Sequence, residues 1–489
     1  MSSSRDILPE SPLVKTKIIA TVGPACAERA KLRALVEAGV DVFRLNFAHG
    51  SHEWLEEIVR RIRSVSEVLG KPIAILGDLS GPKIRLGQLP EEGITCEEGV
   101  HFRFVREADP EDEAQLTCTY PQLIDDVTVG ERILLADGRV EMQVLETPAD
   151  GESILCAVTR PGILRSKQGV NLPGTVLSTP SLTEKDRRDL AWALANGLDF
   201  VGLSFVRSAE DIRQLRQAIA DHKSEYPPHI IAKIEKLEAV DDLERILERT
   251  DAVMVARGDL GVEVDIERVP TLQKRIIRMC NEHRVPVITA TQMLDSMEDS
   301  EFPTRAEASD VANAVLDGSD AVMLSGETAI GAYPVEAVAM MSRIAREAER
   351  LVVPGQFEGM KGHARTRARA VTEAVAHGAG AAAEHLDADL IVVGTHSGKT
   401  AMAVSNQRGR VPIVAMSNRP DTARRLCLYW GITAVDSPSV QEEPENILNF
   451  VVGWGWGQGL LKSGSRIVLI TGTNWSAERH DMMLIHVVS

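Results

Sequence analysis

Short apolar runs rich in valine and isoleucine recur along the chain, and a turn and a segment of helical period follow each one. Eight runs are predicted as strands: 16–23, 40–47, 72–79, 199–206, 229–235, 252–259, 286–293 and 321–328. Helices are predicted at 51–69, 183–196, 238–249 and 268–284, where apolar residues recur at i, i+3 and i+4. Continuous apolar strands that alternate with helices are typical of parallel sheets. The pattern predicts a (β/α)₈ barrel, whose active site lies at the C-terminal ends of its strands.

One long interruption separates the third predicted strand from the fourth. Roughly a hundred residues lie between Leu79 and Ser181, and they carry short alternating runs punctuated by glycine. This pattern predicts an inserted β-rich, barrel-like domain at 85–179. An insertion at the C-terminal end of a barrel strand favours a lid over the active site, although a purely structural insertion stays open.

The pattern of apolar runs and helical segments changes again after Glu349. A stretch at 354–369 resembles a linker, and an alanine-rich helix and alternating strands and helices follow it. The pattern predicts an open, doubly wound α/β domain with an antiparallel edge strand. The predicted domains are therefore a barrel at 1–84 and 180–350, the insertion at 85–179, and a C-terminal domain at 351–489.

Composition narrows the possible partners. The formal net charge of −17 repels phosphate backbones and anionic lipid, so we expect neither nucleic acid nor a membrane as a partner. The six cysteines form no Cys-x-x-Cys pair, which argues against a zinc site or a disulfide framework. No signal-like segment or apolar run of membrane-spanning length occurs, and we expect a cytoplasmic protein.

The strand at 229–235 carries an unusual pair of charges. Alternation places Ile231, Lys233 and Glu235 on one face of an otherwise apolar strand. The next strand ends at Asp259, so two carboxylates are expected at neighbouring strand ends. Such a pair suits Mg²⁺, and a lysine beside it suits phosphoryl or enolate chemistry. A solvent-exposed ion pair at 233 and 235, and a turn-capping role for Asp259, are the alternatives.

Further polar residues are expected at the same rim. Each basic residue alone would be an ordinary surface charge, but together they supply the local positive potential that an acidic protein needs for an anionic substrate. The set comprises Arg44, Asn46, Asp78, Lys83 and Arg85. Thr291 ends the seventh strand and could supply a hydroxyl, unless that hydroxyl bonds to the backbone.

A turn in the C-terminal domain has the composition of a phosphate site. Hydroxyls and backbone N–H groups are expected to gather at a helix N-terminus. The turn comprises Thr395, Ser397, Gly398, Lys399 and Thr400. A simple helix cap is the alternative.

These runs together resemble one known family over nearly the whole chain. In order, the segments KIIATVGPA, RLNFAHG, GDLSGPKIR, SKQGVNLPG, AKIEKLEAV, MVARGDLGVE and TATQMLDSM are similar to those of pyruvate kinases. The resemblance implies a barrel with a β-rich lid and a C-terminal regulatory domain, usually in a homotetramer. It also implies transfer of the phosphoryl group of phosphoenolpyruvate to ADP, giving ATP and pyruvate, with Mg²⁺, for which Mn²⁺ is a possible substitute.

The resemblance also implies roles at matching positions. Lys233 resembles the lysine that stabilises the transition state, Arg44 the phosphate-binding arginine, and Thr291 the residue beside the enol carbon. Glu235 and Asp259 resemble the metal ligands, and the backbone N–H groups of Gly258 and Asp259 the donors to the substrate carboxylate. The residues that resemble the family's nucleotide contacts are Asn46, Arg85 and Lys167. The turn at 395–400 is similar to a loop that binds a sugar-phosphate or nucleotide-monophosphate effector.

The chain departs from the potassium-dependent pattern of that family, in which an Asn, a Ser, an Asp and a Thr surround K⁺ and a Glu follows. Asn46 and Asp78 are kept, whereas Ala48 replaces the Ser, Leu79 the Thr and Lys83 the Glu. An ammonium group can occupy roughly the space of K⁺, so the sequence predicts that K⁺ is not required. A solvated lysine at the lid hinge is the alternative.

Two other functions compete with this one. A Mg²⁺-dependent aldolase or lyase acting on a pyruvate enolate would use similar residues, but it explains neither the lid nor Lys233. A phosphosugar-sensing protein without catalysis would be favoured if the lysine or a metal ligand were missing, and none is.

Overall fold

The eight apolar runs form the eight parallel strands of a closed barrel, in the order β1-β16-β15-β14-β13-β12-β3-β2. The computed structural model describes residues 13–109, 112, 114–148, 151–175, 177–353, 355, 370–441, 443–472 and 481–489. The barrel strands are β1 (Lys17–Thr21), β2 (Val42–Asn46), β3 (Ala74–Asp78), β12 (Phe200–Leu203), β13 (His229–Ile234), β14 (Ala252–Ala256), β15 (Val287–Ala290) and β16 (Ala321–Leu324).

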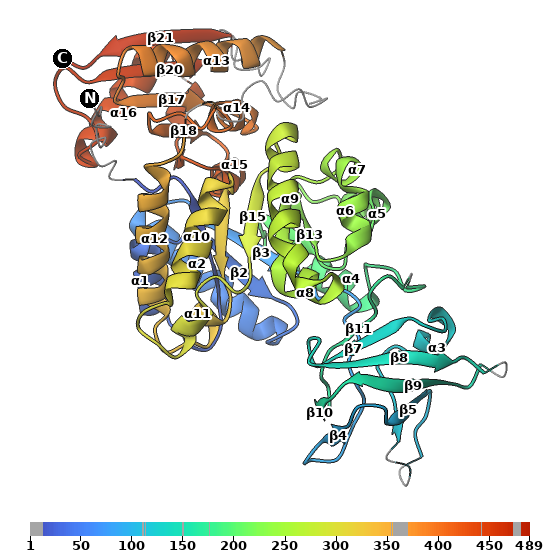
Figure 1. Cartoon of the computed structure of the whole chain (residues 1–489). Helices are drawn as coiled ribbons and strands as arrows, with labels where there is room; N and C mark the ends of the chain where they lie inside the picture. Colours follow the sequence, from blue (N-terminus) through green and yellow to red (C-terminus); the bar gives the residue numbers. More distant parts are fainter. Residues whose placement is uncertain are drawn as a thin grey trace, which may run out of the picture.

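Helices surround this barrel (Figure 1). The longer ones are α1 (Arg29–Ala38), α2 (His52–Leu69), α4 (Glu184–Ala195), α5 (Ala209–Asp221), α9 (Val269–His283), α10 (Arg305–Leu316) and α12 (Pro334–Glu349). The shorter ones are α6 (Leu237–Asp241), α7 (Leu243–Leu247), α8 (Arg257–Glu263), α11 (Gly326–Ala329) and the 3₁₀ turns η1 (Ile266–Arg268) and η2 (Asp295–Glu298).

Two predicted boundaries in this region were wrong. The strand expected at 252–259 ends at Ala256, because α8 begins at Arg257 and turns the Arg-Gly-Asp segment into a helix. The helix expected at 238–249 is split into α6 and α7 at Asp242, whose carboxylate accepts a hydrogen bond from Ala209 N at 2.8 Å.

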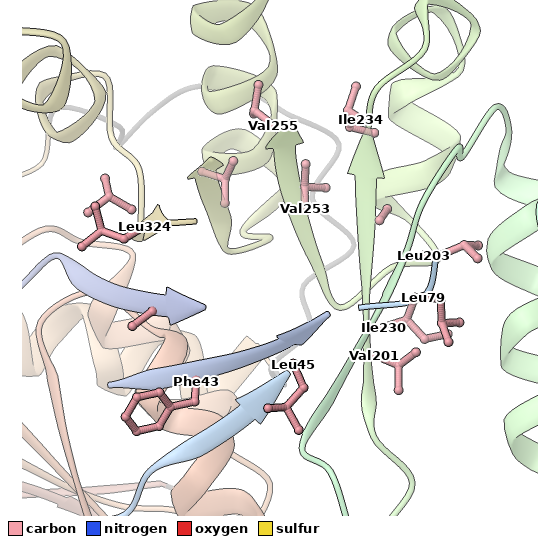
Figure 2. Packing of buried hydrophobic residues seen from close by; sticks show 14 of the residues in the cluster. Phe43, Leu45, Leu79, Val201, Leu203, Ile230, Ile234, Val253, Val255 and Leu324 are labelled. Carbon is pink, nitrogen blue, oxygen red and sulfur yellow. The ribbon is translucent and has the colours of Figure 1, made fainter. Parts of the chain in front are cut away.

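Side chains alternate along each barrel strand between two cores. On β2, Phe43 and Leu45 point outward into the cluster beneath the helices, whereas Val42 packs inside the barrel. Figure 2 shows part of the outer cluster, to which Ile230 and Ile234 of β13 also belong. The inward phase of β13 is therefore the one that holds Ile231 and Lys233, so this register puts the charged residues inside the barrel mouth.

The insertion between β3 and α4 is a separate β-rich unit with its own core. Its strands form a six-stranded sheet, β11-β7-β8-β9-β5-β6, and a two-stranded sheet, β10-β4, which confirms the β-rich insertion predicted from the sequence. Its elements are β4 (Ile94–Cys96), β5 (His101–Val105), β6 (Gln115–Leu116), α3 (Leu123–Asp126), β7 (Arg132–Leu135), β8 (Val140–Glu146), β9 (Ser153–Arg160), β10 (Gly162–Leu164) and β11 (Val170–Asn171).

The C-terminal unit has the predicted doubly wound pattern, with sheet order β19-β18-β17-β20-β21 and one antiparallel edge strand, β21. Its elements are α13 (Ala370–His385), β17 (Leu390–Gly394), α14 (Lys399–Ser405), β18 (Ile413–Ser417), α15 (Pro420–Arg425), η3 (Leu426–Leu428), β19 (Ile432–Asp436), η4 (Pro438–Gln441), α16 (Pro444–Gly457), β20 (Arg466–Thr471) and β21 (Met482–Val487). Apart from residue 355, the stretch expected as a linker at 354–369 lies outside the described residues.

The insertion and the C-terminal unit lie at opposite ends of the barrel (Figure 1). The insertion follows the C-terminal end of β3, which is the end where barrel enzymes carry their sites. In the described part of the chain, we find no helix that has both the length and the apolar character needed to span a bilayer.

Candidate active site at the barrel mouth

Lys233 is the centre of the charged cluster. Its Nζ lies 2.8 Å from Glu235 Oε1 and 3.4 Å from Asp78 Oδ1, and it donates a hydrogen bond to Ser204 Oγ at 2.6 Å. The side chain is 11% exposed, while those of Asp78 and Glu235 are almost fully buried. The alternative of a solvent-exposed ion pair is therefore excluded for this lysine.

Lys233 and Asp78 stabilise each other's charged forms. Burial alone would lower the pKa of Lys233, but the carboxylates of Asp78 and Glu235 outweigh it and raise the pKa above its usual value. Burial likewise opposes ionisation of Asp78, yet Lys233 and Arg44 hold its pKa below the ordinary range. The mouth therefore contains a largely buried ammonium group, and a charge removed from solvent acts strongly on a bound anion.

Arg44 is fixed beside this cluster. Its Nε and Nη2 each lie 2.7 Å from Asp78 Oδ2, and its Nη1 donates to Thr21 Oγ1 at 3.2 Å. Arg44 comes from β2, Asp78 from β3 and Thr21 from β1, so three neighbouring strands set its position. A second permanent cation is thus held at the rim that was predicted from sequence.

Glu235 and Asp259 are the two carboxylates that were expected from the sequence to hold a metal ion. Burial raises the pKa of Glu235; Lys233 opposes this effect, and the charge of the nearby Asp259 adds to it. Glu235 Oε2 accepts a hydrogen bond from Phe205 N at 2.8 Å, and its buried Oε1 faces Lys233. Two crowded carboxylates fit a small hard cation, because Mg²⁺ takes one or two protein carboxylates and completes its shell with water and substrate oxygens.

A larger protein ligand set is absent from the part of the chain that the structure describes. No group of three or more His, Cys, Asp or Glu side chains there is arranged to hold a metal.

Thr291 lies at the end of β15, next to Gly258 of α8. Its Oγ1 accepts a hydrogen bond from Gly258 N at 2.8 Å and donates one to Ala290 O at 2.7 Å. The alternative of a backbone-bonded threonine thus describes this structure, and the Gly258 N–H expected to bind a carboxylate is occupied by that hydroxyl.

The residues expected to contact the nucleotide lie on two units. Arg85 Nη1 donates to Lys167 O at 3.1 Å, so these two residues lie together at the base of the insertion. Asn46 lies on the barrel at the end of β2, and its Oδ1 accepts a hydrogen bond from Ala48 N at 3.0 Å.

Two of the three departures from the potassium-dependent pattern, Lys83 and Leu79, lie in different surroundings. Lys83 Nζ lies 3.8 Å from Asp259 Oδ1, so the lysine faces the cluster, although its side chain is 40% exposed. Leu79 is fully buried in the outer core (Figure 2), and its carbonyl accepts a hydrogen bond from Ser204 Oγ at 2.7 Å. A side chain at position 79 therefore points away from the mouth, so the expectation that its change removes a side-chain ligand was wrong.

The C-terminal turn at 395–400 offers fewer hydroxyls than the sequence suggested. Thr395 and Thr400 are buried, and Thr395 Oγ1 accepts a hydrogen bond from Gly398 N at 3.0 Å. Gly398 has a φ of 82°, a value that favours glycine. Ser397 and Lys399 are the exposed members of the turn.

Two residues of the site were missed from sequence. Ser204 follows β12 and links Lys233 to the carbonyl of Leu79, and its only signal was its place after a buried strand. Arg257 lies within the recognised segment MVARGDLGVE, but no role was assigned to it, and it binds the backbone around Thr291. Neither motif spacing nor alternation could show which carbonyl an arginine reaches.

A closed parallel barrel with a buried lysine, paired carboxylates and an arginine at its mouth defines the class of enzymes that stabilise a small, highly charged anion. Comparisons with known proteins narrow this class. Residues 13–338 match the family described as "Pyruvate kinase, barrel domain", and residues 373–486 match "Pyruvate kinase, alpha/beta domain".

Curated relatives and a solved structure agree with this result. The chain is 41% identical to pyruvate kinase of Geobacillus stearothermophilus over 97% of its own length and 80% of the relative. It is 42% identical to pyruvate kinase 2 of Synechocystis over 98% of its length and 80% of the relative. A crystal structure of a pyruvate kinase from Cryptosporidium parvum superposes with a TM-score of 0.91 at 35% identity and covers 98% of both chains.

The chain belongs to the pyruvate kinase family, and it is a phosphotransferase. Membership implies a divalent metal, in general Mg²⁺, as well as phosphoenolpyruvate and ADP as substrates and an oligomeric state as the usual one.

Proposed function

We propose that this chain transfers the phosphoryl group of phosphoenolpyruvate to ADP through the cluster around Lys233. The observation that carries the proposal is a buried ammonium group held within 3.4 Å of two carboxylates at the barrel mouth. Phosphoryl transfer needs little covalent help from the protein and depends on placed positive charge. Lys233 and Arg44 would neutralise the phosphoryl oxygens in flight.

Glu235 and Asp259 would hold the Mg²⁺ ion. When bound, the metal supplies positive charge to the phosphoryl and enolate oxygens. The backbone N–H groups of Gly258 and Asp259 would bind the substrate carboxylate. Since Gly258 N–H now donates to Thr291 Oγ1, a carboxylate that takes this donor would release the threonine hydroxyl beside the enol carbon.

The nucleotide would lie between the barrel and the insertion. Asn46 of the barrel and the pair Arg85 and Lys167 of the insertion are the proposed contacts. A lid carrying two of these residues would close when ADP binds both sides, and closure would exclude the water that hydrolyses the phosphoryl group.

We also propose that Lys83 replaces K⁺. Its ammonium group lies 3.8 Å from Asp259, and Ala48 offers no oxygen where the potassium-dependent pattern has a serine. Leu79 contributes nothing to this argument. An assay at fixed ionic strength, with tetramethylammonium in place of K⁺, should show full activity that still requires Mg²⁺.

An effector site at the C-terminal turn is proposed on narrower grounds. Ser397 and Lys399 present a hydroxyl and an ammonium group to solvent beside the backbone of a tight turn. A sugar phosphate or a nucleotide monophosphate would bind there and lower the apparent KM for phosphoenolpyruvate. The test substitutes Lys399 by Glu, because Thr400 is buried and its replacement would disturb packing.

We further propose a homotetramer in the cytoplasm, with the domain bounds predicted from sequence. Sedimentation velocity of the purified protein, with a tetramer of 53.3 kDa subunits as the expected species, tests the assembly.

One assay tests the central proposal. Purified protein with Mg²⁺, ADP and phosphoenolpyruvate should form ATP and pyruvate in equal amounts. ³¹P NMR measures the ATP, and a coupled assay measures the pyruvate. Pyruvate release from a longer keto acid, without ATP, would favour the aldolase or lyase. Binding of phosphorylated ligands without turnover would favour the sensing protein.

A further inference from the structure

Arg257 is a buried arginine whose side chain spans from α8 to the end of β15. It is the first residue of α8, directly after β14, and is 8% exposed. Its Nε lies within hydrogen-bond distance of Ala290 O at 3.3 Å and Thr291 O at 3.2 Å, and its Nη2 donates to Thr291 O at 2.7 Å and Gln292 O at 3.0 Å. Three consecutive carbonyl groups therefore converge on one guanidinium group.

The backbone that Arg257 binds has an unfavourable conformation. Thr291 has a φ of 67° and Gln292 a φ of 52°, so two successive residues with side chains lie in the left-handed region. This region is rare for a β-branched residue, and such a conformation persists only where its surroundings enforce it.

The guanidinium group is itself anchored from outside the site. Its Nη1 donates to Asp310 Oδ2 of α10 at 2.6 Å and to Gln273 Oε1 of α9 at 3.4 Å. The planar fork can therefore face two helices on one side and the carbonyl groups on the other. A lysine has one ammonium centre and cannot span these acceptors.

Both polar groups of Thr291 are held by one dipeptide. The Arg257 side chain binds its carbonyl oxygen, and the Gly258 N–H binds its hydroxyl oxygen. Gly258 packs directly against the threonine, since a Cβ at this position would lie 3.4 Å from Thr291 Oγ1, in van der Waals contact. The dipeptide thus couples the place of Thr291 to the start of α8, which also carries Asp259.

We propose that Arg257 is a positioning residue that sets Thr291 against the enol carbon for proton transfer. The inference rests on the proposed function. In that step the enolate carbon takes a proton from a water molecule, and its C=C electron pair forms the new C–H bond. The enolate oxygen becomes the ketone oxygen of pyruvate, and the hydroxide left behind is neutralised by the buffer.

Proton transfer can be followed apart from phosphoryl transfer. Exchange of the methyl protons of pyruvate with D₂O is the reverse of enolate protonation, and ¹H NMR measures it in the presence of Mg²⁺ and inorganic phosphate. Arg257→Lys should slow this exchange and kcat by about tenfold or more, a change of about 1.4 kcal/mol per factor of ten. It should leave the KM for phosphoenolpyruvate within about twofold, because Arg44 and Lys233 are untouched.

A matched control carries the same substitution at the other end of the barrel. Arg63 also binds backbone carbonyl groups, those of Ile73 at 2.8 Å and Gly197 at 3.1 Å. Arg63→Lys should leave the exchange rate and kcat at the wild-type level. Equal slowing by both variants would show a general structural effect and overturn the proposal.

A double-mutant cycle decides whether Arg257 acts through Thr291. Arg257→Lys should slow exchange strongly in the wild type but only slightly in Thr291→Ala. If Arg257→Lys fails to fold, Asp310→Asn, which loosens the anchor and keeps the arginine, should show the same dependence on Thr291 with a smaller effect. An equal loss in both backgrounds would overturn the proposal.

The outcomes separate this inference from the proposed function. A wild type that makes no ATP from phosphoenolpyruvate contradicts the proposed function. A wild type that is active, with a slow Thr291→Ala variant and an unaffected Arg257→Lys variant, contradicts the inference alone.

Discussion

Lys233 of β13 and Asp78 of β3 form an ion pair of 3.4 Å across an intervening strand, β12. Lys233 also donates a hydrogen bond to Ser204, which follows that intervening strand. Residues on or next to three neighbouring strands thus hold the ammonium group of Lys233. Its position therefore depends on the closed barrel rather than on a flexible loop. The predictions below test what this charge and its neighbours do.

Lys233→Met should abolish turnover. A methionine fills similar space without charge, so kcat should fall by at least about 10²-fold. The loss also leaves Asp78 and Glu235 buried without their cation, which should cost roughly 3–5 kcal/mol of unfolding free energy. Steady-state kinetics and urea unfolding measure the two effects.

Lys236→Met is the control for that substitution. Lys236 is also buried, and its Nζ lies 2.5 Å from Glu263 Oε1. The variant should lose stability and keep kcat in the wild-type range. A large loss of kcat in Lys236→Met, or normal turnover in folded Lys233→Met, would contradict the assignment.

Lys83→Glu should lower activity in the presence or absence of K⁺. The new carboxylate would replace an ammonium group that now lies 3.8 Å from Asp259 Oδ1, so attraction would give way to repulsion. K⁺ should not restore the rate, because Ala48 still offers no oxygen. Activation of the wild type many-fold by K⁺ would show that the ammonium group does not replace the ion. Lys185→Glu, on the barrel side of the hinge, is a charge-matched comparison.

Asp251→Asn should reveal a pH-dependent part of the stability. Burial opposes ionisation of Asp251, but His229, Arg216 and the Ile230 N–H outweigh it and hold the pKa below its ordinary value. Because the folded pKa is depressed, the carboxylate stabilises the fold fully above the unfolded pKa of about 3.9. This contribution is lost as the pH falls through the folded pKa.

The measurement is urea unfolding of wild type and Asp251→Asn between about pH 8 and pH 3. The difference in unfolding free energy should stay constant from neutral pH down to about pH 5 and shrink below about pH 4. A difference that grows on acidification would contradict the sign of the pKa shift.

Arg408→Met should weaken the junction between the barrel and the C-terminal unit. Arg408 Nη1 lies 3.0 Å from Asp320 Oδ1, both side chains are almost fully buried, and the guanidinium group lies over the Trp430 ring. Removing the arginine leaves the carboxylate of Asp320 buried without its partner, which should lower the free energy of unfolding by roughly 3–5 kcal/mol. Part of the loss should return in the double variant with Asp320→Asn. Additive losses in urea unfolding would contradict the pairing.

Local sequence patterns predicted much of the fold for a definite reason. Alternation along a buried strand fixes which side chains point inward, so Lys233 and Glu235 could be assigned to one face before the structure was known. Contacts between distant segments carry no such period. Three features depend on tertiary packing, and the sequence did not predict them. They are the approach of Lys83 to Asp259, the hydrogen bonds from Arg257 to the backbone around Thr291, and the outward direction of Leu79.

The direct pairing of the two strands that flank the insertion bears on how this fold evolved. β3 and β12 pair directly, with Leu76 opposite Phe200 and Asp78 opposite Gly202, although the whole insertion separates them in the chain. The hydrogen-bond ladder that closes the barrel therefore runs past the insertion without using it. A gene encoding the barrel alone could have acquired this segment at one loop without disturbing the ladder, and later changes could tune the segment while the barrel stayed intact.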